Sequence, residues 1–344
     1  MAVIATGFFD GVHPGHRLVI DTLLSEASRR GEESVVVTFW PHPRAVLQSD
    51  APSLRYLSSR SERESALREL GVTRVETVRF SREFASLPAS GYVEMLRSRF
   101  GASALVLGYD TRFGSDRSGP EEIAREAASL GIDAVITPPV LCGGSPVSSS
   151  RIRTALEDGD AVWAAELLGR PYRLHGVVVE GNHIGRTIGF PTANMQLYEP
   201  LMCIPRNGVY ETRVYMGAAA DSGFAAGGCV GAAIISGGCE ADGVSGASGG
   251  GAAGSEHPVL AGAALLQEPC SRCFRGLTNI GVRPTVGGGA CTIETHILGF
   301  DEMIYGLDIT IEFVARIRDE RRFDSLDSLR LQLESDLRSL NSII

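Results

Sequence analysis

Two histidines three residues apart are the first side chains in this sequence that could do chemistry. His13 and His16 lie in Gly7-Phe-Phe-Asp-Gly-Val-His-Pro-Gly-His16, which follows a β-branched run and precedes a helical pattern. The proline suits the first helical position, where free backbone amides favour an anion. Imidazoles at this spacing can address one phosphate group, and Gly7 and Gly15 allow a nucleotide to approach the backbone closely. We therefore predict a phosphate site, with helix capping or packing as the alternative.

Three further segments place polar side chains at the ends of predicted strands or at a predicted helix start. They are Thr38-Phe-Trp-Pro-His-Pro43, Gly108-Tyr-Asp-Thr-Arg-Phe-Gly114 and Val147-Ser-Ser-Ser-Arg-Ile-Arg153. Open α/β sheets bind ligands at the carboxyl ends of their strands. In the third segment, serine hydroxyls and the forked donors of Arg151 and Arg153 suit phosphate oxygens. Taken singly, each segment is more often a turn or a cap.

The second half of the chain contains a glycine-rich segment, Gly181-Asn-His-Ile-Gly-Arg-Thr-Ile-Gly-Phe-Pro-Thr-Ala-Asn194. Its glycines permit a close backbone approach to phosphates, and its arginine adds positive charge. Thr192 and Asn194 offer hard oxygen atoms of the kind that Mg²⁺ accepts. The pattern predicts a magnesium-nucleotide loop, and a glycine-rich hairpin with a proline turn is the alternative.

A carboxylate on a predicted strand, Glu294, could serve that loop. Period-two alternation in Cys291-Thr-Ile-Glu-Thr-His-Ile-Leu298 puts Glu294 and His296 on one face of the strand. A carboxylate beside a metal-nucleotide site is a candidate general base for a hydroxyl nucleophile. A solvated strand residue is the alternative for Glu294 alone.

The elements that must position these residues differ between the two halves of the chain. The first half alternates β-branched runs with helical segments, which predicts a doubly wound parallel α/β sheet that ends near residue 140. We expect strands at 3–6, 34–39, 74–78, 104–107 and 134–137, and helices at 14–29, 61–70, 90–100, 120–130 and 149–168. From residue 172, glycine turns separate strands at 174–180, 208–215, 276–281, 292–298 and 309–318, followed by a helix at 325–340. This second pattern is typical of a small β-barrel or sandwich.

Composition narrows the chemistry further. The chain has 344 residues, 44% of them hydrophobic and 21% charged, and a net charge of -9, which suits a soluble protein of two domains. The sequence contains no lysine, which excludes a lysine-dependent phosphate loop, a lysine Schiff base and the strand lysine of a protein kinase. The acidic balance and the lack of a membrane-length apolar run or basic leader predict a cytoplasmic protein without nucleic-acid or membrane partners.

A stretch of glycine, alanine and serine at about 216–274 interrupts the second half. It can bury little surface per ordered residue, so we expect a flexible insertion between two barrel strands. The insertion holds most of the cysteines, and without an export signal we expect no disulfides. Cys270 and Cys273 could form half of a zinc site with Cys229, Cys239 or His257, although their spacing fits incidental thiols better.

In their order along the chain, these segments resemble the bacterial bifunctional riboflavin kinase/FMN adenylyltransferase family. Gly208-Val-Tyr210, Thr278-Asn-Ile-Gly-Val-Arg-Pro-Thr285 and Arg316-Ile-Arg-Asp-Glu-Arg-Arg-Phe323 extend the likeness over nearly the whole chain. The resemblance implies a Rossmann-like α/β nucleotidyltransferase domain at 1–145, a linker helix region at 146–171, and a riboflavin kinase domain at 172–344. The kinase domain would be a six-stranded split barrel with a C-terminal helix.

The resemblance also implies the reactions and the residues that serve them. The first domain would transfer AMP from ATP to FMN, and the second would phosphorylate riboflavin with Mg²⁺ and ATP. The implied catalytic residues are Glu294 for the kinase and His13, His16 and Arg153 for the adenylyltransferase. The implied nucleotide-binding residues are Gly7, Phe8, Asp10, Gly15, Asp110, Ser148 and Ser149 in the first domain and Gly181, Gly185, Arg186, Gly189 and Thr192 in the second, with Thr192 and Asn194 at the magnesium ion.

The sequence departs from the family pattern at Trp40, Thr111 and Gly299, where the family usually has an acidic residue, Phe and Asp. Two alternatives stay open at this stage. One is a monofunctional kinase whose first domain is inactive, and the other is a flavin- or nucleotide-binding regulator without turnover.

Overall fold

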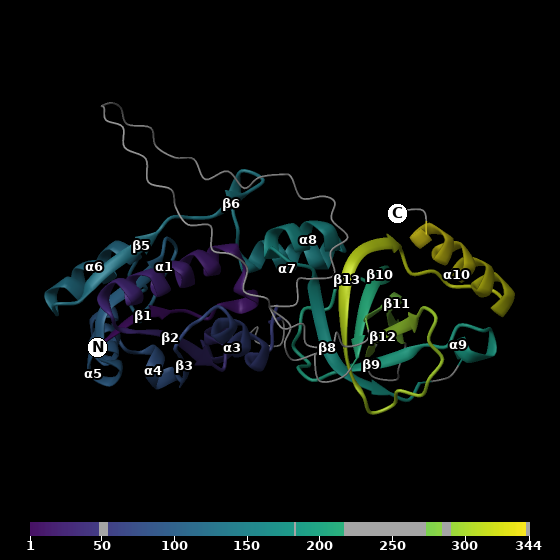
Figure 1. The fold of residues 1–344 in the computed structure, drawn as a ribbon, viewed down its shortest axis with the longest axis horizontal. Coiled ribbons are helices and arrows are strands. Elements are labelled where there is room, and N and C mark those ends of the chain that lie inside the picture. Colours follow the sequence, from purple (N-terminus) through teal and green to yellow (C-terminus); the bar gives the residue numbers. More distant parts are fainter. Residues whose placement is uncertain (48–53, 182–183, 217–272, 284–289, 342–344) are drawn as a thin grey trace, which may run out of the picture.

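The fold is described by a computed structural model over residues 1–47, 54–181, 184–216, 273–283 and 290–341. A parallel sheet flanked by helices forms the first part of the chain and a closed antiparallel barrel forms the second (Figure 1). Two short helices, α7 (Ser149–Asp158) and α8 (Ala161–Leu168), lie between them. We refer to residues 1–168 as the sheet half and to residues 172–344 as the barrel half.

The sheet is doubly wound, as the sequence pattern predicts. Its strands are β1 (Ala2–Thr6), β2 (Glu33–Trp40), β3 (Arg74–Arg79), β4 (Ala102–Gly108) and β5 (Asp133–Thr137), in the spatial order β3-β2-β1-β4-β5. All neighbouring strands are parallel. The chain runs outward from β1 to β3 and then returns to the other side of β1, so the strand order reverses between β1 and β4. The carboxyl ends of these two strands mark the usual ligand crevice of such a sheet.

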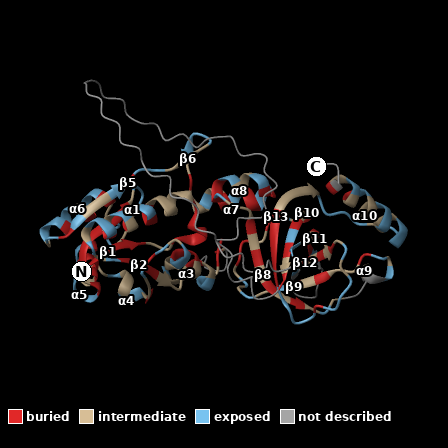
Figure 2. Cartoon of the chain, viewed as in Figure 1, coloured by how far each residue is buried: buried red, intermediate tan, exposed pale blue. Residues whose placement is uncertain are grey.

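Helices cover both faces of the sheet because its central strands β1, β2 and β4 are apolar on both sides. On one face, Val3 and Ala5 pack with Ile20 and Leu23 of α1 (Pro14–Arg30), and α3 (Arg60–Glu69) adds Leu67. On the other face, Ile4 joins a cluster with α5 (Ala89–Phe100) and α6 (Pro120–Ser129). The buried residues are concentrated along the central strands β1, β2 and β4 (Figure 2). Short helical segments η1 (Asp10–Val12), α2 (Pro43–Leu47) and α4 (Arg82–Ala85) complete this half.

The barrel closes in the order β10-β11-β12-β9-β8-β13, and every neighbouring pair is antiparallel. Its strands are β8 (Tyr172–Val179), β9 (Ala193–Leu197), β10 (Gly208–Met216), β11 (Cys273–Arg283), β12 (Ala290–Ile297) and β13 (Asp308–Arg318), with α9 (Ile184–Thr187) between β8 and β9. The C-terminal helix α10 (Leu326–Asn341) packs Leu340 against Val209 and Leu277. The prediction of a barrel or sandwich is thus settled in favour of a six-stranded closed barrel with a C-terminal helix.

Three local features differ from the sequence prediction. The helix expected at 149–168 is two helices, because Gly159 adopts φ +83° and the Asp160 side chain accepts the Trp163 amide to begin α8. Strand β9 was not predicted, and it forms between β8 and β12. The turn-rich segment after β5 contains a short hairpin, β6 (Leu141–Cys142) and β7 (Ser145–Pro146).

The insertion expected at 216–274 connects β10 with β11, and residues 217–272 lie outside the described residues. The zinc hypothesis rests on Cys229, Cys239, His257 and Cys270, which are outside them as well. Over the described ranges, no group of three or more His, Cys, Asp or Glu side chains is placed to hold a metal ion. No helix in the described part of the chain is both long enough and apolar enough to cross a membrane.

Candidate active sites

A cavity of about 440 Å³ opens where β1 and β4 end, at the point where the strand order of the sheet reverses. We call it the sheet cavity. The N-termini of α1 and α7 both reach it, through Gly15 and His16 and through Ser148 to Ser150. Two helix N-termini at one cavity supply unpaired amides and two positive dipole ends, which suit an anion such as a phosphate. Of the predicted residues, it is lined by Gly7, Phe8, His13, Gly15, His16, Asp110, Ser148 and Ser149.

The two histidines lie against each other at the start of α1. Their rings stack with 3.7 Å between centroids, and His13 Nδ1 accepts the backbone N–H of His16 at 3.4 Å. Burial, with the positive charge of Arg153, lowers the pKa of His13 to about 4. Burial and the neighbouring His13 and Arg63 lower the pKa of His16 well below its usual value. Both imidazoles are therefore neutral at pH 7, and the buried His16 Nδ1 has no hydrogen-bond partner among the described residues.

The serines at the start of α7 hold two different structural positions. Ser148 is the N-cap residue, and its hydroxyl accepts the Arg151 amide at 3.3 Å. The Ser149 hydroxyl donates to the backbone carbonyl of Asp10 at 3.1 Å, which ties α7 to the segment that precedes α1. The sequence motifs at residues 7–16 and 147–153 are thus brought to one wall of the sheet cavity.

Asp10 and Arg153 are not among the residues that line the sheet cavity. Asp10 is only 3% exposed, and its carboxylate accepts the backbone amides of Leu57 and Ser58 and an N–H from Arg153. Arg153 Nε donates to the Arg55 carbonyl at 2.6 Å. In this structure the two side chains therefore hold the segment 54–58 in place beside the cavity.

Arg151 donates to backbone carbonyls and not toward the cavity. Its guanidinium reaches the carbonyls of Cys142, Ser145 and Pro146 at 3.1, 2.8 and 2.7 Å. These bonds fix the β6–β7 hairpin, whose flanking residues Pro138, Val140 and Val147 line the sheet cavity. From the sequence we predicted only that the sheet ends near residue 140, although the prolines of this segment and its position after a strand end were a usable signal.

One further charged residue near this site was not predicted. Arg63 is fully buried, none of its guanidinium nitrogens has a hydrogen-bond partner among the described residues, and it lies 4.0 Å from the centroid of the Phe8 ring. Burial lowers its pKa, and the nearby Asp10 carboxylate opposes that effect. Arg63 thus adds positive charge behind Phe8, one of the side chains that line the cavity.

The second site is a cavity of about 300 Å³ between the outer face of the barrel and α10, which we call the barrel cavity. Glu294, His296, Thr192 and Gly185 line it, as do Leu329 and Leu333 of α10. Its other lining residues include Asn279, Arg318, Glu320, Arg321 and Phe323. The strand alternation predicted for β12 is observed, because Ile293, Thr295 and Ile297 are buried inside the barrel.

Glu294 and Asn194 lie directly opposite each other on β12 and β9. Asn194 lines a different cavity of about 390 Å³, whereas Thr192 lines the barrel cavity and a small pocket at residues 300–305. A Cβ on Gly181 would lie 2.2 Å from the Asn194 amide nitrogen, so only glycine lets the loop approach Asn194 so closely. A Cβ on Gly185 would likewise lie 2.2 Å from the Phe190 carbonyl oxygen.

These residues fit a magnesium-nucleotide site. A hydroxyl, an amide oxygen and a carboxylate are hard oxygen donors, and Mg²⁺ usually takes few protein ligands and completes its shell with water and substrate phosphates. The glycines of the loop that begins at Gly181 carry no side chain, so a phosphate can approach the backbone closely. Of the remaining predicted residues, Gly189 adopts φ +81° beside open space, and the side chain of Arg186 lies outside the described residues.

Arg318 ties the barrel cavity to the C-terminal helix. Its guanidinium donates to both carboxylate oxygens of Asp336 at 2.8 to 3.0 Å, and Asp336 is 2% exposed. Arg318 itself lines the cavity. The role of Arg318 could not be predicted from its sequence motif, because its partner lies 18 residues away on another element.

The three positions that depart from the family pattern take different places. Thr111 lines the sheet cavity, whereas Trp40 packs against the ring of Tyr56 at 5.7 Å between centroids. Gly299 follows β12 in a left-handed conformation with φ +68°. Of the three, only Thr111 lies in the wall of a described cavity that we assign to a nucleotide.

The fold and the two candidate sites together are those of a nucleotide-dependent transferase with two parts. The first part is a doubly wound sheet with a candidate anion site where its strand order reverses. The second part is a closed barrel with a carboxylate beside a glycine-rich loop. Comparisons with known proteins agree. The family model for FAD synthetase matches residues 1–151, and that for riboflavin kinase matches residues 168–344. The bifunctional riboflavin kinase/FMN adenylyltransferase of Escherichia coli (strain K12) is 32% identical over 97% of this chain and 90% of its own length. The chain belongs to the bifunctional riboflavin kinase/FMN adenylyltransferase family.

A second curated relative has the same name, and a solved structure has the same fold. The protein of that name from Bacillus subtilis (strain 168) is 29% identical over 97% of this chain and 90% of its own length. A crystal structure described as a macrolide-efflux protein from Streptococcus pneumoniae has a TM-score of 0.78 and 29% identity, and the match covers 98% of this chain and 92% of that one. That description differs from the names of the curated relatives, with which both family-model matches agree. The family inferred from the sequence motifs is confirmed, and both of its catalytic domains are present.

Proposed function

We propose that this chain phosphorylates riboflavin to FMN at the barrel cavity and adenylylates FMN to FAD at the sheet cavity, with ATP as the co-substrate of both reactions. The observation that carries the proposal is the pairing of two separate sites in one chain. One brings two helix N-termini and two neutral imidazoles together, and the other sets Glu294 opposite Asn194 beside a glycine loop.

At the barrel cavity, Glu294 is the proposed base. Its carboxylate would accept the proton of the ribityl 5′-hydroxyl while that oxygen forms a bond to the γ-phosphorus of ATP and the bond to the β–γ bridging oxygen breaks. Thr192 and Asn194 would hold Mg²⁺, which neutralises charge on the phosphates when it is bound. The apolar side chains of Leu329 and Leu333 would face the flavin and exclude water from one side.

At the sheet cavity, the proposed reaction needs no covalent enzyme intermediate. A phosphate oxygen of FMN would attack the α-phosphorus of ATP, and pyrophosphate would leave with the bridging oxygen. His13 and His16, neutral in the free protein, would each donate one N–H to phosphate oxygens on which negative charge grows. The amides at the starts of α1 and α7 would stabilise the same charge, and Asp110 lies where a polar side chain can contact the nucleotide.

The proposal keeps the domain boundaries, the location, the partners and the metal that the sequence predicts. The domain boundaries are 1–145 for the adenylyltransferase, 146–171 for the linker helices and 172–344 for the kinase. The enzyme is assigned to the cytoplasm, where ATP is available, and it acts on small molecules without a nucleic-acid partner. Mg²⁺ is the metal of the kinase site.

The direct test is incubation of the full chain with riboflavin, ATP and Mg²⁺, with FMN and FAD resolved over time. The proposal predicts that FMN appears first and FAD follows, and that supplied FMN also gives FAD. A reaction that stops at FMN would support the alternative of a monofunctional kinase. Flavin binding without either product would support the regulator.

A further inference from the structure

A five-residue segment of the sheet half, Leu54–Ser58, joins the two halves of the molecule. The backbone N–H of Tyr56 donates to the Leu201 carbonyl at 2.7 Å, and the Cys203 N–H donates to the Tyr56 carbonyl at 2.7 Å. Tyr56 and Met202 thereby form an isolated parallel β-bridge between the halves. The barrel partner, residues 201–203, belongs to the connection that leaves β9, the strand of Asn194.

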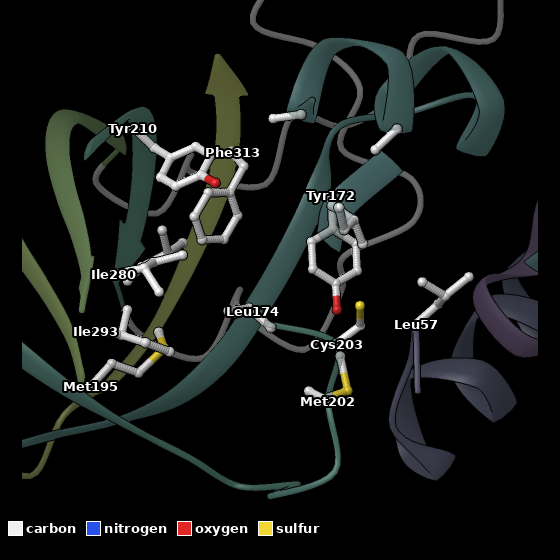
Figure 3. Close-up of a cluster of buried hydrophobic side chains, with 14 of the residues drawn as sticks. Leu57, Tyr172, Leu174, Met195, Met202, Cys203, Tyr210, Ile280, Ile293 and Phe313 are labelled. Atoms are coloured by element: carbon white, nitrogen blue, oxygen red, sulfur yellow. The ribbon is translucent and has the colours of Figure 1, made fainter. Parts of the chain in front are cut away.

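Apolar packing reinforces this bridge. Tyr56, Leu57, Met202 and Cys203 are each 3% exposed or less and belong to one core cluster with Tyr172 of β8. Figure 3 shows Met202 and Cys203 below Tyr172, on the side toward Leu57. Because these side chains are buried together, the two halves share one close-packed hydrophobic core at this contact. The segment 54–58 should therefore not shift independently of the barrel.

The same segment supports the sheet cavity through its other polar groups. The amides of Leu57 and Ser58 donate to the Asp10 carboxylate at 3.0 and 3.1 Å, and the Ser58 hydroxyl accepts the Gly11 amide at 3.0 Å. Asp10 in turn pairs with Arg153. These contacts fix the turn between Gly7 and His13, which is part of the cavity wall.

The ring of Tyr56 also supports the wall of the cavity. It stacks on Phe8 with 6.0 Å between centroids and 28° between planes, and it lies 6.1 Å from the ring of His42. Phe8 lines the sheet cavity. Thus one residue, Tyr56, has its backbone paired with the barrel and its side chain packed behind the proposed nucleotide site.

We propose that the barrel connection Leu201–Cys203 is a positioning element of the adenylylation site, acting through its pairing with Tyr56. The inference rests on the proposed function of the sheet cavity. The proposed effect should reach the sheet cavity and not the barrel cavity, because all described residues that line the barrel cavity belong to the barrel half. Loss of the pairing should therefore reduce adenylylation and leave phosphorylation intact.

The expected size of the effect follows from how strictly reacting groups must be placed. A displacement of about 1 Å in a group that positions a substrate can cost about 100-fold in rate. Release of the 54–58 segment would free Asp10, Arg153 and Phe8 together. We therefore expect the kcat for FAD formation from supplied FMN to fall by about 100-fold, with a smaller change in the KM for ATP.

The test variant is Cys203→Pro in the full chain, which removes the N–H that donates to Tyr56. Its matched control is Cys203→Ala, which keeps that N–H and should retain most of both activities. The expected result for Cys203→Pro is near-normal FMN formation from riboflavin, which also shows that the barrel is folded, with strongly reduced FAD formation from FMN. Undiminished FAD formation in a variant with normal kinase activity would overturn the proposal.

A second variant keeps the proposal testable if Cys203→Pro loses both activities. Tyr56→Leu keeps the backbone pairing and removes the aromatic ring that packs against Phe8. This variant should lower the kcat of adenylylation and leave the kinase rate unchanged. Full adenylylation activity would contradict the proposal. Cys203→Pro combined with Arg153→Met should lose no more activity than the worse single variant, because both act through one set of contacts. Additive losses would also contradict the proposal. A wild-type chain that makes no FAD from FMN would refute the proposed function instead.

Discussion

The buried carboxylate of Asp10 forms an ion pair with the partly exposed guanidinium of Arg153, and the pair joins two sequence motifs 143 residues apart. Arg153 lies in the helix that begins with the serine motif, and Asp10 precedes the helix that begins with His13 and His16. The pair holds the two helix N-termini at one cavity. This ion pair therefore helps to position the proposed anion site, and it does so without a lysine.

Removal of one partner of this pair should be costly. Arg153→Met leaves the buried Asp10 carboxylate without its counter-charge, which typically lowers the free energy of unfolding by about 3 to 5 kcal/mol. Asp10→Asn leaves the partly exposed Arg153 without its partner and should cost less, because water can reach that guanidinium. Urea titration followed by tryptophan fluorescence is the measurement, because Trp40 and Trp163 both lie in the sheet half. The double variant should be destabilised by clearly less than the sum of the two single variants. Simple additivity would show that the pair is not coupled.

The stability of the sheet half should depend on pH through its histidines. The pKa of His13 is about 4 in the folded protein and 6.5 when unperturbed, so the unfolded chain binds more protons between these values. The free energy of unfolding should therefore fall as the pH drops from 6.5 to 4, by about 3 kcal/mol from His13 alone. Burial lowers the pKa of His16 and of His42 as well, and both add to this trend.

The matched control is His13→Asn. This variant should lose the His13 share of the pH dependence, and the slope of unfolding free energy against pH should flatten between pH 6.5 and 4. An unchanged slope would mean that His13 is not buried as a neutral group. Chemical denaturation at several pH values, read by the same tryptophan signal, gives the comparison.

A side chain at Gly181 should displace Asn194. In Gly181→Ala the new Cβ would lie 2.2 Å from the Asn194 amide, so the loop or Asn194 must move. Because Asn194 is a proposed magnesium ligand, we expect FMN formation to fall by at least about 10-fold while FAD formation from FMN is unchanged. Gly91→Ala is the control, because its Cβ would meet nothing closer than 3.5 Å within α5. Equal kinase rates in the two variants would contradict the close approach.

The charge of Arg63 should lower the stability of the sheet half and support adenylylation. Its guanidinium is buried with no hydrogen-bond partner among the described residues, and burial of such a charge is unfavourable. Arg63→Met keeps the stem and removes the charge, so we expect the sheet half to be about 1 to 3 kcal/mol more stable. Because the positive charge behind Phe8 would be lost, adenylylation should slow. A large loss of stability measured by urea titration would show that the Arg63 charge is paired in solution.

The fold class followed from the sequence because both kinds of periodicity were strong. The β-branched runs and helical segments of the first half gave every strand of the sheet to within a few residues. The helix break at Gly159 was missed, although Asp-Gly-Asp there combines a C-cap signal with an N-cap signal. Strand β9 was missed because Ala193–Leu197 has little β propensity of its own, and pairing with β8 and β12 makes it a strand.

The site was only partly visible in the sequence. Many of the residues that line the cavities lie in local motifs that could be recognised one by one, whereas Pro138, Val140, Leu329 and Leu333 do not. The burial of Asp10 could not, because the amides that cover it come from Leu57 and Ser58, on a segment with no motif. The same holds for Arg63, whose burial depends on tertiary packing against Phe8. Long-range contacts of this type have no local sequence signal.

The central claim, that one chain carries two separate active sites, is tested most directly by inactivating each site in turn and measuring both products in one assay. Glu294→Gln and His16→Ala would each be incubated with ATP and Mg²⁺ and with either riboflavin or FMN, and both flavin products would be quantified. The account predicts that Glu294→Gln loses about 100-fold or more of FMN formation yet still converts FMN to FAD. His16→Ala should still form FMN but make little FAD. A parallel loss of both activities in either correctly folded variant would contradict the account.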